Sequence, residues 1–197
     1  ATGSKVRILG TSDFLITASY YDDRYRVLQT LSDDHLGNKN RSTNAYYGIT
    51  GWVTKSKLQH GSALTSLSET DYDHAGRVLK TYLTLDDGTR VIASAMEYNE
   101  LGQLVDKKLH STDNGTTYLQ SVDYRYNIRG WLRTINNDQL TTDSDNDESN
   151  DLFGMNLSYE QPVTINGSAT TAQFNGNISS ISWGSNNLVD PLKQKIY

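Results

Sequence analysis

The chain has 197 residues, a formal net charge of −5 and a hydrophobic fraction of 36%. This length fits one large domain or two small ones, and the apolar fraction lies below the roughly 45–50% of typical globular domains, so we do not expect a thick dry core. The interspersed charges argue against a nucleic-acid partner, the absence of cysteine excludes disulfides and thiolate metal sites, and no apolar run is long enough for a membrane-spanning helix.

A short motif led by tyrosine recurs along the chain. Its copies are YDDRYRVL, YGITGWVT, YDHAGRVL, YNELGQLV and YNIRGWLR, which begin at Tyr21, Tyr47, Tyr72, Tyr98 and Tyr126. The spacings between them are 26, 25, 26 and 28 residues, and a degenerate sixth copy, FNGNISSI, begins at Phe174. A near-constant period of this kind predicts a repeat architecture.

Each copy has the chemistry of a tight turn. Asp or Asn in the first place and Gly in the fourth are typical of a type I turn, and the glycine can then adopt a positive φ angle. Three copies satisfy this fully, through the pairs Asp73 and Gly76, Asn99 and Gly102, and Asn127 and Gly130. The second copy keeps Gly51 but has Gly48 in the aspartate place. The first keeps Asp22 but has Tyr25 in the glycine place, so we expect that turn to differ.

The segments between these turns are predicted to be β-strands. They are residues 52–60, 64–72, 77–85, 89–98, 103–111 and 116–126, and Asp-Gly and Asn-Gly pairs join two of the hairpins. No segment has a helical period. We therefore expect an all-β chain, a meander of antiparallel hairpins with about 26 residues per repeat that forms a single curled strip over residues 1–197. The repeat tyrosines could form a ladder across neighbouring hairpins.

The motif resembles the Y-D-x-x-G-R-L signature of RHS/YD-repeat proteins. YDHAGRVL carries the likeness most fully, and YNELGQL and YNIRGWL are similar to versions from Bacteroidetes-type bacteria. The resemblance implies a strip of hairpins that closes into a hollow β-shell, as in bacterial polymorphic toxins, the C components of insecticidal toxin complexes, and teneurins. In the toxins, the family implies an enclosed C-terminal toxin, often released by self-cleavage at an aspartate-containing motif after the last repeat, and a core motif that contains D-P-x-G. Here Asp190 and Pro191 are present but Lys193 stands in the glycine place, so we do not assign a protease site.

The period is interrupted by an acidic insertion loop over residues 137–151. Asp143, Asp145 and Asp147 alternate as at the start of a calcium loop. The sixth place is Glu148, where an EF-hand needs glycine, and the twelfth is Gly154, where it needs glutamate. A solvated acidic loop is therefore the favoured interpretation, and a Ca²⁺ site at these three aspartates is the alternative.

No constellation of catalytic residues stands out. The histidines, at positions 35, 60, 74 and 110, are scattered and match no metal-binding motif. Trp52 and Trp131 follow repeat glycines, and Trp183 ends the last copy, so packing along the strip is favoured over sugar stacking. We expect no catalytic residue and no cofactor.

These features together predict a non-catalytic structural segment of a secreted or cell-surface RHS/YD-repeat protein, which helps to enclose a toxin or other cargo. The expected partners are further repeats of the same or a neighbouring chain and the enclosed cargo. The alternative is a β-module that binds a glycan or a protein at the cell surface.

Overall fold

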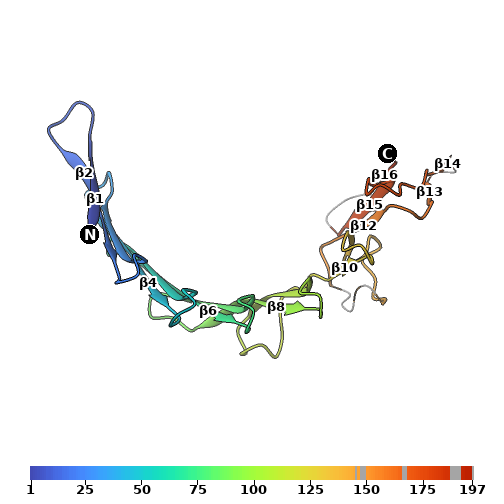
Figure 1. Cartoon of the computed structure of the whole chain (residues 1–197), viewed down its shortest axis with the longest axis horizontal. Helices are drawn as coiled ribbons and strands as arrows, with labels where there is room; N and C mark the ends of the chain where they lie inside the picture. Colours follow the sequence, from blue (N-terminus) through green and yellow to red (C-terminus); the bar gives the residue numbers. More distant parts are fainter. Residues whose placement is uncertain (145, 147–149, 166–167, 187–191, 197) are drawn as a thin grey trace. The chain divides into compact units, whose positions relative to one another are not determined.

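We analysed a computed structural model of the chain, which describes residues 1–144, 146, 150–165, 168–186 and 192–196. This part contains 16 strands and no helix (Figure 1). Accordingly, no helix in these residues is long and apolar enough to cross a bilayer. The predicted all-β fold is confirmed.

Nine strands form one antiparallel sheet in which spatial order follows chain order. These strands are β1 (Thr2–Arg7), β2 (Phe14–Tyr21), β3 (Val27–Asp33), β4 (Lys39–Tyr46), β5 (Val53–His60), β6 (Leu64–Tyr72), β7 (Val78–Leu85), β8 (Val91–Tyr98) and β9 (Leu104–Ser111). Each strand is joined to the next by a short turn, so the predicted meander of hairpins is confirmed.

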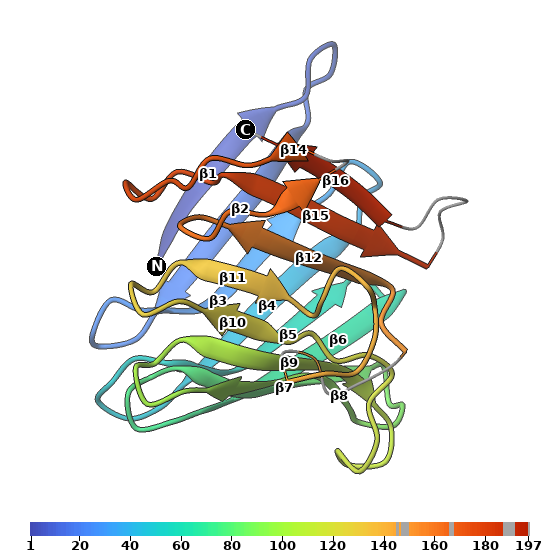
Figure 2. The same ribbon diagram turned by 90° about the vertical axis from the view of Figure 1, so that its right-hand side faces the viewer.

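A second sheet has five strands, which lie side by side in Figure 2. They are β10 (Tyr124–Tyr126), β11 (Leu132–Ile135), β12 (Phe153–Ser158), β15 (Ser180–Ser185) and β16 (Leu192–Ile196). A separate hairpin of β13 (Thr164–Ile165) and β14 (Ser168–Ala169) lies between β12 and β15 in the sequence.

The chain divides into two compact units, which we describe separately. Unit 1 comprises residues 1–95 and 110–117, and unit 2 comprises residues 96–109 and 118–197. Among the described residues, the only buried apolar side chains are Ile92 and Ala95, both in unit 1. Backbone ladders and contacts between neighbouring hairpins, rather than a thick apolar core, therefore hold these sheets together.

Buried positions in unit 2 are mostly polar. Asp123 and Asn136 are each 3% exposed, and the Asn136 side chain accepts a hydrogen bond from the Asp123 backbone N–H and donates one to the Phe153 carbonyl. Because buried polar groups are costly unless they are paired, such bonds fix the local register.

The predicted strand over residues 116–126 is wrong for most of its length. Only Tyr124–Tyr126 forms a strand, and the preceding residues touch the neighbouring strand through two isolated bridges, Leu109 with Gln120 and Asp106 with Asp123. The loop 111–117 instead folds on Asp113, whose carboxylate accepts bonds from the N–H groups of Thr116 and Thr117. The hydrogen bonds of the Asp113 side chain therefore stabilise a loop here, although the local sequence favours a strand.

Candidate functional site

The repeat turn at Asp73 shows how the motif works. One carboxylate oxygen of Asp73 accepts the N–H groups of Ala75 and Arg77 at 2.8 and 2.9 Å, and the other binds the Arg77 guanidinium at 2.6 Å. The N–H of Gly76 donates to the Asp73 carbonyl, and Gly76 has a φ of +84°. Asn99 and Asn127 make the same pair of side-chain bonds in their own turns, with Gly102 and Gly130 at positive φ.

The turn at Asp22 corrects one expectation. Although Tyr25 replaces glycine, it adopts a φ of 61°, and its N–H donates to the Asp22 carbonyl as in the other copies. The Asp22 carboxylate also accepts the N–H groups of Arg24 and Arg26. The turn therefore keeps the repeat geometry, with a tyrosine in a left-handed conformation that glycine usually occupies.

The second copy is shifted by one residue from the sequence alignment. The N–H of Tyr47 bonds to the Trp52 carbonyl, and the N–H of Gly51 bonds to the Tyr47 carbonyl, so Tyr47 occupies the aspartate place of a turn with one extra residue. Tyr46 takes the tyrosine place, because it pairs with Val53 at the end of β4. The side chain of Tyr47 is 61% exposed at the turn.

Three repeat tyrosines reach back to the repeat before them. The hydroxyls of Tyr46, Tyr72 and Tyr159 donate to the backbone carbonyls of Val27, Val53 and Leu132, each at 2.8 Å. In every case the acceptor lies two residues after the positive-φ position of the preceding turn. This bond is the ladder-like contact that joins neighbouring hairpins.

The residue directly after each positive-φ position covers the glycine of the next turn. A Cβ placed on Gly76 would lie only 2.7 Å from Cζ2 of Trp52, and one placed on Gly176 would lie 3.0 Å from Cζ2 of Trp131. The same place is filled by Arg26 over Gly51, at 3.8 Å, and by Gln103 over Gly130, at 3.2 Å. At Gly76 and Gly176, glycine is thus required for close approach as well as for backbone angle.

The same covering residue also packs on the next tyrosine. The ring centroids of Trp52 and Tyr72 are 5.4 Å apart, and those of Trp131 and Tyr159 are 5.3 Å apart. The Arg26 guanidinium lies 4.7 Å from the centre of the Tyr46 ring. Covering residue, tyrosine and glycine therefore form one recurring contact, which we call the repeat junction.

The sixth copy is built differently from the alignment on Phe174. Gly176 has a φ of 92° and lies beneath Trp131, while Tyr159 occupies the tyrosine place. Phe174 lies two residues before the glycine and is 68% exposed. A hairpin made of β13 and β14 separates Tyr159 from Gly176, so the constant spacing no longer identifies the copy.

Two hollows of the described surface occupy equivalent places beside two repeat junctions. The first, which we call the Tyr47 groove, has a volume of about 570 Å³. Its lining residues are Tyr47, Thr50, Trp52, Thr54, Thr70, Asp71, Tyr72, Asp73 and His74. Tyr47 and Trp52 are nearly parallel, with ring centroids 6.3 Å apart and an interplanar angle of 17°.

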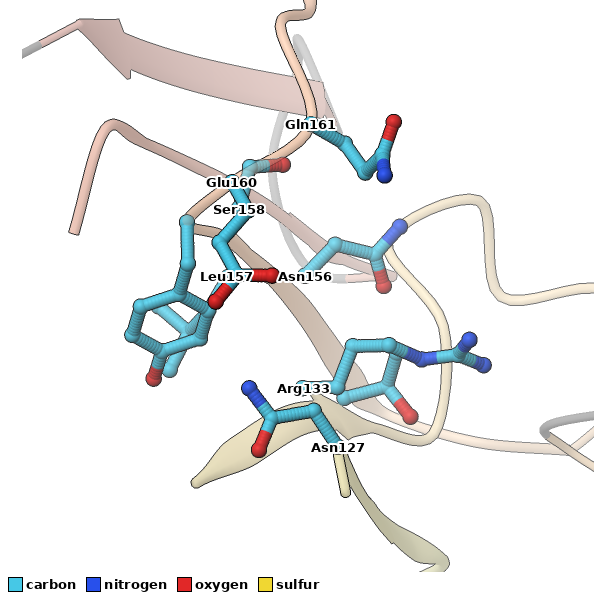
Figure 3. A pocket seen from close by; sticks show the side chains of 9 residues that line it. Asn127, Arg133, Asn156, Leu157, Ser158, Glu160 and Gln161 are labelled. Atoms are coloured by element: carbon cyan, nitrogen blue, oxygen red, sulfur yellow. The ribbon is translucent and has the colours of Figure 1, made fainter. Parts of the chain in front are cut away.

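The second hollow, the Asn127 groove, has a volume of about 380 Å³ and lies in unit 2. Asn127 takes the place of Tyr47, and the segment 157–161 takes the place of the segment 70–74. In Figure 3, Asn127 and Arg133 lie on one side of the hollow, and Asn156 and Gln161 come from the facing segment. At the turn position, the Asn127 groove therefore has a polar side chain, whereas the Tyr47 groove has an aromatic ring.

Electrostatics distinguish the Tyr47 groove further. Burial opposes the ionisation of Asp73, but the backbone and side-chain donors of Arg77 outweigh it and hold the pKa of Asp73 below its ordinary value. Asp71 accepts a hydrogen bond from the Tyr82 hydroxyl at 2.8 Å, and burial followed by this bond raises the pKa of Tyr82. The lining of the groove contains two acidic side chains, Asp71 and Asp73, and no lysine or arginine.

A cluster of buried carboxylates in unit 2 is charge-compensated. Asp106 accepts a hydrogen bond from Ser121 at 2.6 Å and pairs with Lys108 at 3.0 Å. Asp123 pairs with Arg125 at 3.2 Å, and this guanidinium also donates to backbone carbonyls. Hydrogen bonding to Glu97, followed by the Asp106 contacts, outweighs desolvation and raises the pKa of Lys108. These ion pairs lie beside the isolated bridges between β9 and residues 120–123, where the regular β-ladder is interrupted.

The remaining candidate residues are not brought together in the described structure. Of the calcium-loop aspartates, Asp145 and Asp147 lie outside the described residues, and Asp143 accepts the N–H of Asn146. Asp190 and Pro191 also lie outside the described residues. Within the described ranges, no group of three or more His, Asp or Glu side chains is arranged to hold a metal ion. All four histidines are exposed.

No family model and no curated protein matches the sequence. Solved structures do match: the TcdB2-TccC3-Cdc42 complex (19% identity, TM-score 0.55), TcdB2-TccC3 (18%, 0.54), and the Photorhabdus luminescens Tc holotoxin pore with a mutant TccC3 (19%, 0.52). Each match covers 94% of this chain but only 10% of the other. The likeness confirms an RHS-repeat-like fold; the resemblance to Bacteroidetes-type versions stays a prediction.

Proposed function

We propose that this chain is part of the wall of a β-shell in a secreted or cell-surface RHS/YD-repeat protein, and that the wall encloses a toxin or another cargo. The observation that supports the proposal most directly is the likeness over 94% of the chain to about a tenth of each Tc toxin chain. A segment that spans a tenth of a larger assembly is suited to a structural part within it.

The repeat junctions supply a physical reason for a wall. At the junctions of Tyr72 and Tyr159, neighbouring hairpins are joined by a tyrosine hydroxyl bond, by ring packing and by a covered glycine, so the sheet can extend there without a thick apolar core. We propose that this role is non-catalytic. Strands β1 and β16, each at one edge of its sheet, are suited to pair with further repeats of the same or a neighbouring chain.

Protease protection of the full-length protein that carries this sequence tests the enclosure. The protein is treated with trypsin before and after the repeats are unfolded with urea, and the fragments are identified by mass spectrometry. We expect a polypeptide outside the repeats that resists trypsin until the repeats unfold. Immediate digestion of every segment outside the repeats, with the repeats still folded, would contradict enclosure while leaving the fold unaffected.

A further inference from the structure

A third hollow lies on the sheet of unit 1 and shares no residue with the two grooves beside the repeat junctions. It has a volume of about 560 Å³, within the range of small-molecule sites. Thr65 and Leu67 of β6 lie in its middle, Lys57 of β5 lies on one side, and the turn residues 86–88 after β7 lie on the other. We call it the Lys57 hollow.

Cross-strand pairing places side chains of opposite charge on the two sides of an apolar residue. Lys57 pairs with Leu67, and Leu67 pairs with Thr84, so these three side chains form one row across β5, β6 and β7. Adjacent strands lie about 4.8 Å apart, so the backbones of β5 and β7 are about 10 Å apart along this row. Asp86 and Asp87 follow shortly after Thr84 and line the same hollow. The Lys57 hollow is therefore basic on one side and acidic on the other.

The lysine on the basic side has no acidic partner of its own. The neighbouring lysine of the same strand, Lys55, pairs with Glu69 at 2.7 Å. Lys57 is exposed and forms no ion pair with any residue that the structure describes. Gln59, two residues further along β5, adds an amide donor to the same lining. This side of the hollow is suited to a carboxylate.

The acidic side is held in place by backbone contacts. The N–H of Asp86 donates to the Thr65 carbonyl at 2.6 Å, and one carboxylate oxygen of Asp86 accepts the N–H of Thr65 at 2.8 Å. Asp86 has a φ of 50°, a conformation that residues other than glycine adopt rarely, and such strained residues often lie at binding sites. Asp87 follows it directly and is exposed. Two acidic side chains at a fixed turn are suited to an ammonium group, whose three N–H donors need several acceptors.

We propose that the Lys57 hollow binds molecules that carry a carboxylate and a primary ammonium group at the two ends of a short aliphatic chain. Free ω-amino acids and the C-terminal lysine of a polypeptide both have this chemistry. The carboxylate pairs with Lys57, the ammonium group pairs with Asp86 and Asp87, and the methylene groups pack on Leu67. A molecule with only one of the two charges leaves one side of the hollow unpaired. The inference does not depend on the role of the sheet as a wall.

The test uses the 197-residue chain and isothermal titration calorimetry at pH 7. The probes are ε-aminocaproate, for the free ω-amino acid, and Nα-acetyl-lysine, for the C-terminal lysine. At least one of them is expected to bind, and the tighter probe identifies the source. Lys57→Met and Asp87→Asn should each weaken that binding by about fivefold or more, since each removes one charge contact. Hexylamine, hexanoate and Nα-acetyl-lysine amide each lack one of the charges and should bind at least about fivefold more weakly.

Lys80→Met is the matched control, because Lys80 lies on β7 in the same sheet but does not line the hollow. It should bind the tighter probe as the unaltered chain does. Lys57 and Asp87 are exposed, so both variants should stay folded by circular dichroism. Failure of both probes to bind overturns the proposal. Equal weakening by Lys57→Met and Lys80→Met would assign the effect to net charge and also overturn it. Binding of hexylamine as tight as that of ε-aminocaproate would show that the carboxylate is not recognised, with the same consequence.

Discussion

Replacing Gly76 by alanine separates the two reasons for a glycine in the repeat turn. Gly37 provides a matched site, because it ends a turn of the same type at Asp34 and has a φ of +81°, against +84° at Gly76. The two differ in their surroundings. A Cβ at Gly37 would meet nothing within 4 Å, whereas one at Gly76 would lie 2.7 Å from the Trp52 ring.

The expected losses follow from this difference. Alanine at a left-handed backbone position costs about 1–2 kcal/mol, and this cost applies at both sites. At Gly76 the indole must also move, although Tyr47 and Tyr72 pack beside it, and overpacking of this kind adds about 1–3 kcal/mol. We therefore expect Gly37→Ala to lower the free energy of unfolding by about 1–2 kcal/mol and Gly76→Ala by about 2–5 kcal/mol.

Urea denaturation followed by circular dichroism measures both losses. A double-mutant cycle adds Trp52→Ala, and in that background the cost of Gly76→Ala should fall to the cost of Gly37→Ala, because the covering ring has been removed. Equal losses at the two glycines in the unaltered chain would refute the close-approach argument. A cost at Gly76 that is unchanged without the Trp52 indole would refute it as well.

Three further changes test the other parts of the junction. Tyr72→Phe removes the hydroxyl that donates to Val53 and should lower the free energy of unfolding by about 1 kcal/mol in urea titrations. Asp73→Asn should destabilise the chain at pH 7 but not well below pH 4. Burial of the Asp73 carboxylate is outweighed by the hydrogen-bond donors of Arg77, so its folded-state pKa is depressed. The stability that this carboxylate contributes above its unfolded pKa of about 3.9 is therefore lost as the pH falls through the folded-state pKa. Tyr25→Gly should raise the melting temperature, since it removes a non-glycine residue from positive φ, for a net gain of up to about 1 kcal/mol.

Each of these has a clear opposing result. Unchanged stability of Tyr72→Phe would show that the tyrosine acts through its ring alone. A difference between Asp73→Asn and the unaltered chain that persists undiminished at pH 2 would show that the carboxylate charge is not its source. A lower melting temperature for Tyr25→Gly would show that the exposed tyrosine side chain contributes more than the backbone strain removes.

The repeat and its hairpins were predictable because their chemistry is local. Asp73 and Gly76 lie within one turn, and Asp87 and Gly88 form the turn between β7 and β8, so a short window of sequence contains the signal. The single strand predicted over 116–126 failed for the converse reason. Its residues have β-propensity, but propensity describes single residues and does not predict contacts between them. The capping of the loop by Asp113 and the bridge between Asp106 and Asp123 are such contacts.

The repeat junction was the part that sequence reasoning missed. Tyr46 and Tyr47 are adjacent tyrosines, and only pairing across β4 and β5 decides which one occupies the repeat place. Tyr159 was missed because an inserted hairpin separates it from its glycine. One usable signal was present: Trp52 and Trp131 each follow a repeat glycine directly, and each covers the glycine of a later turn.

The hairpin inserted after Tyr159 shows where such a chain can grow. The ring contact with Trp131 and the approach of that indole to Gly176 both persist, although residues 161–172 separate the tyrosine from its turn. New segments can therefore be grafted at this point while the contacts among Tyr159, Trp131 and Gly176 are kept. A foreign epitope or recognition loop spliced between this tyrosine and its turn would leave the neighbouring hairpins in register.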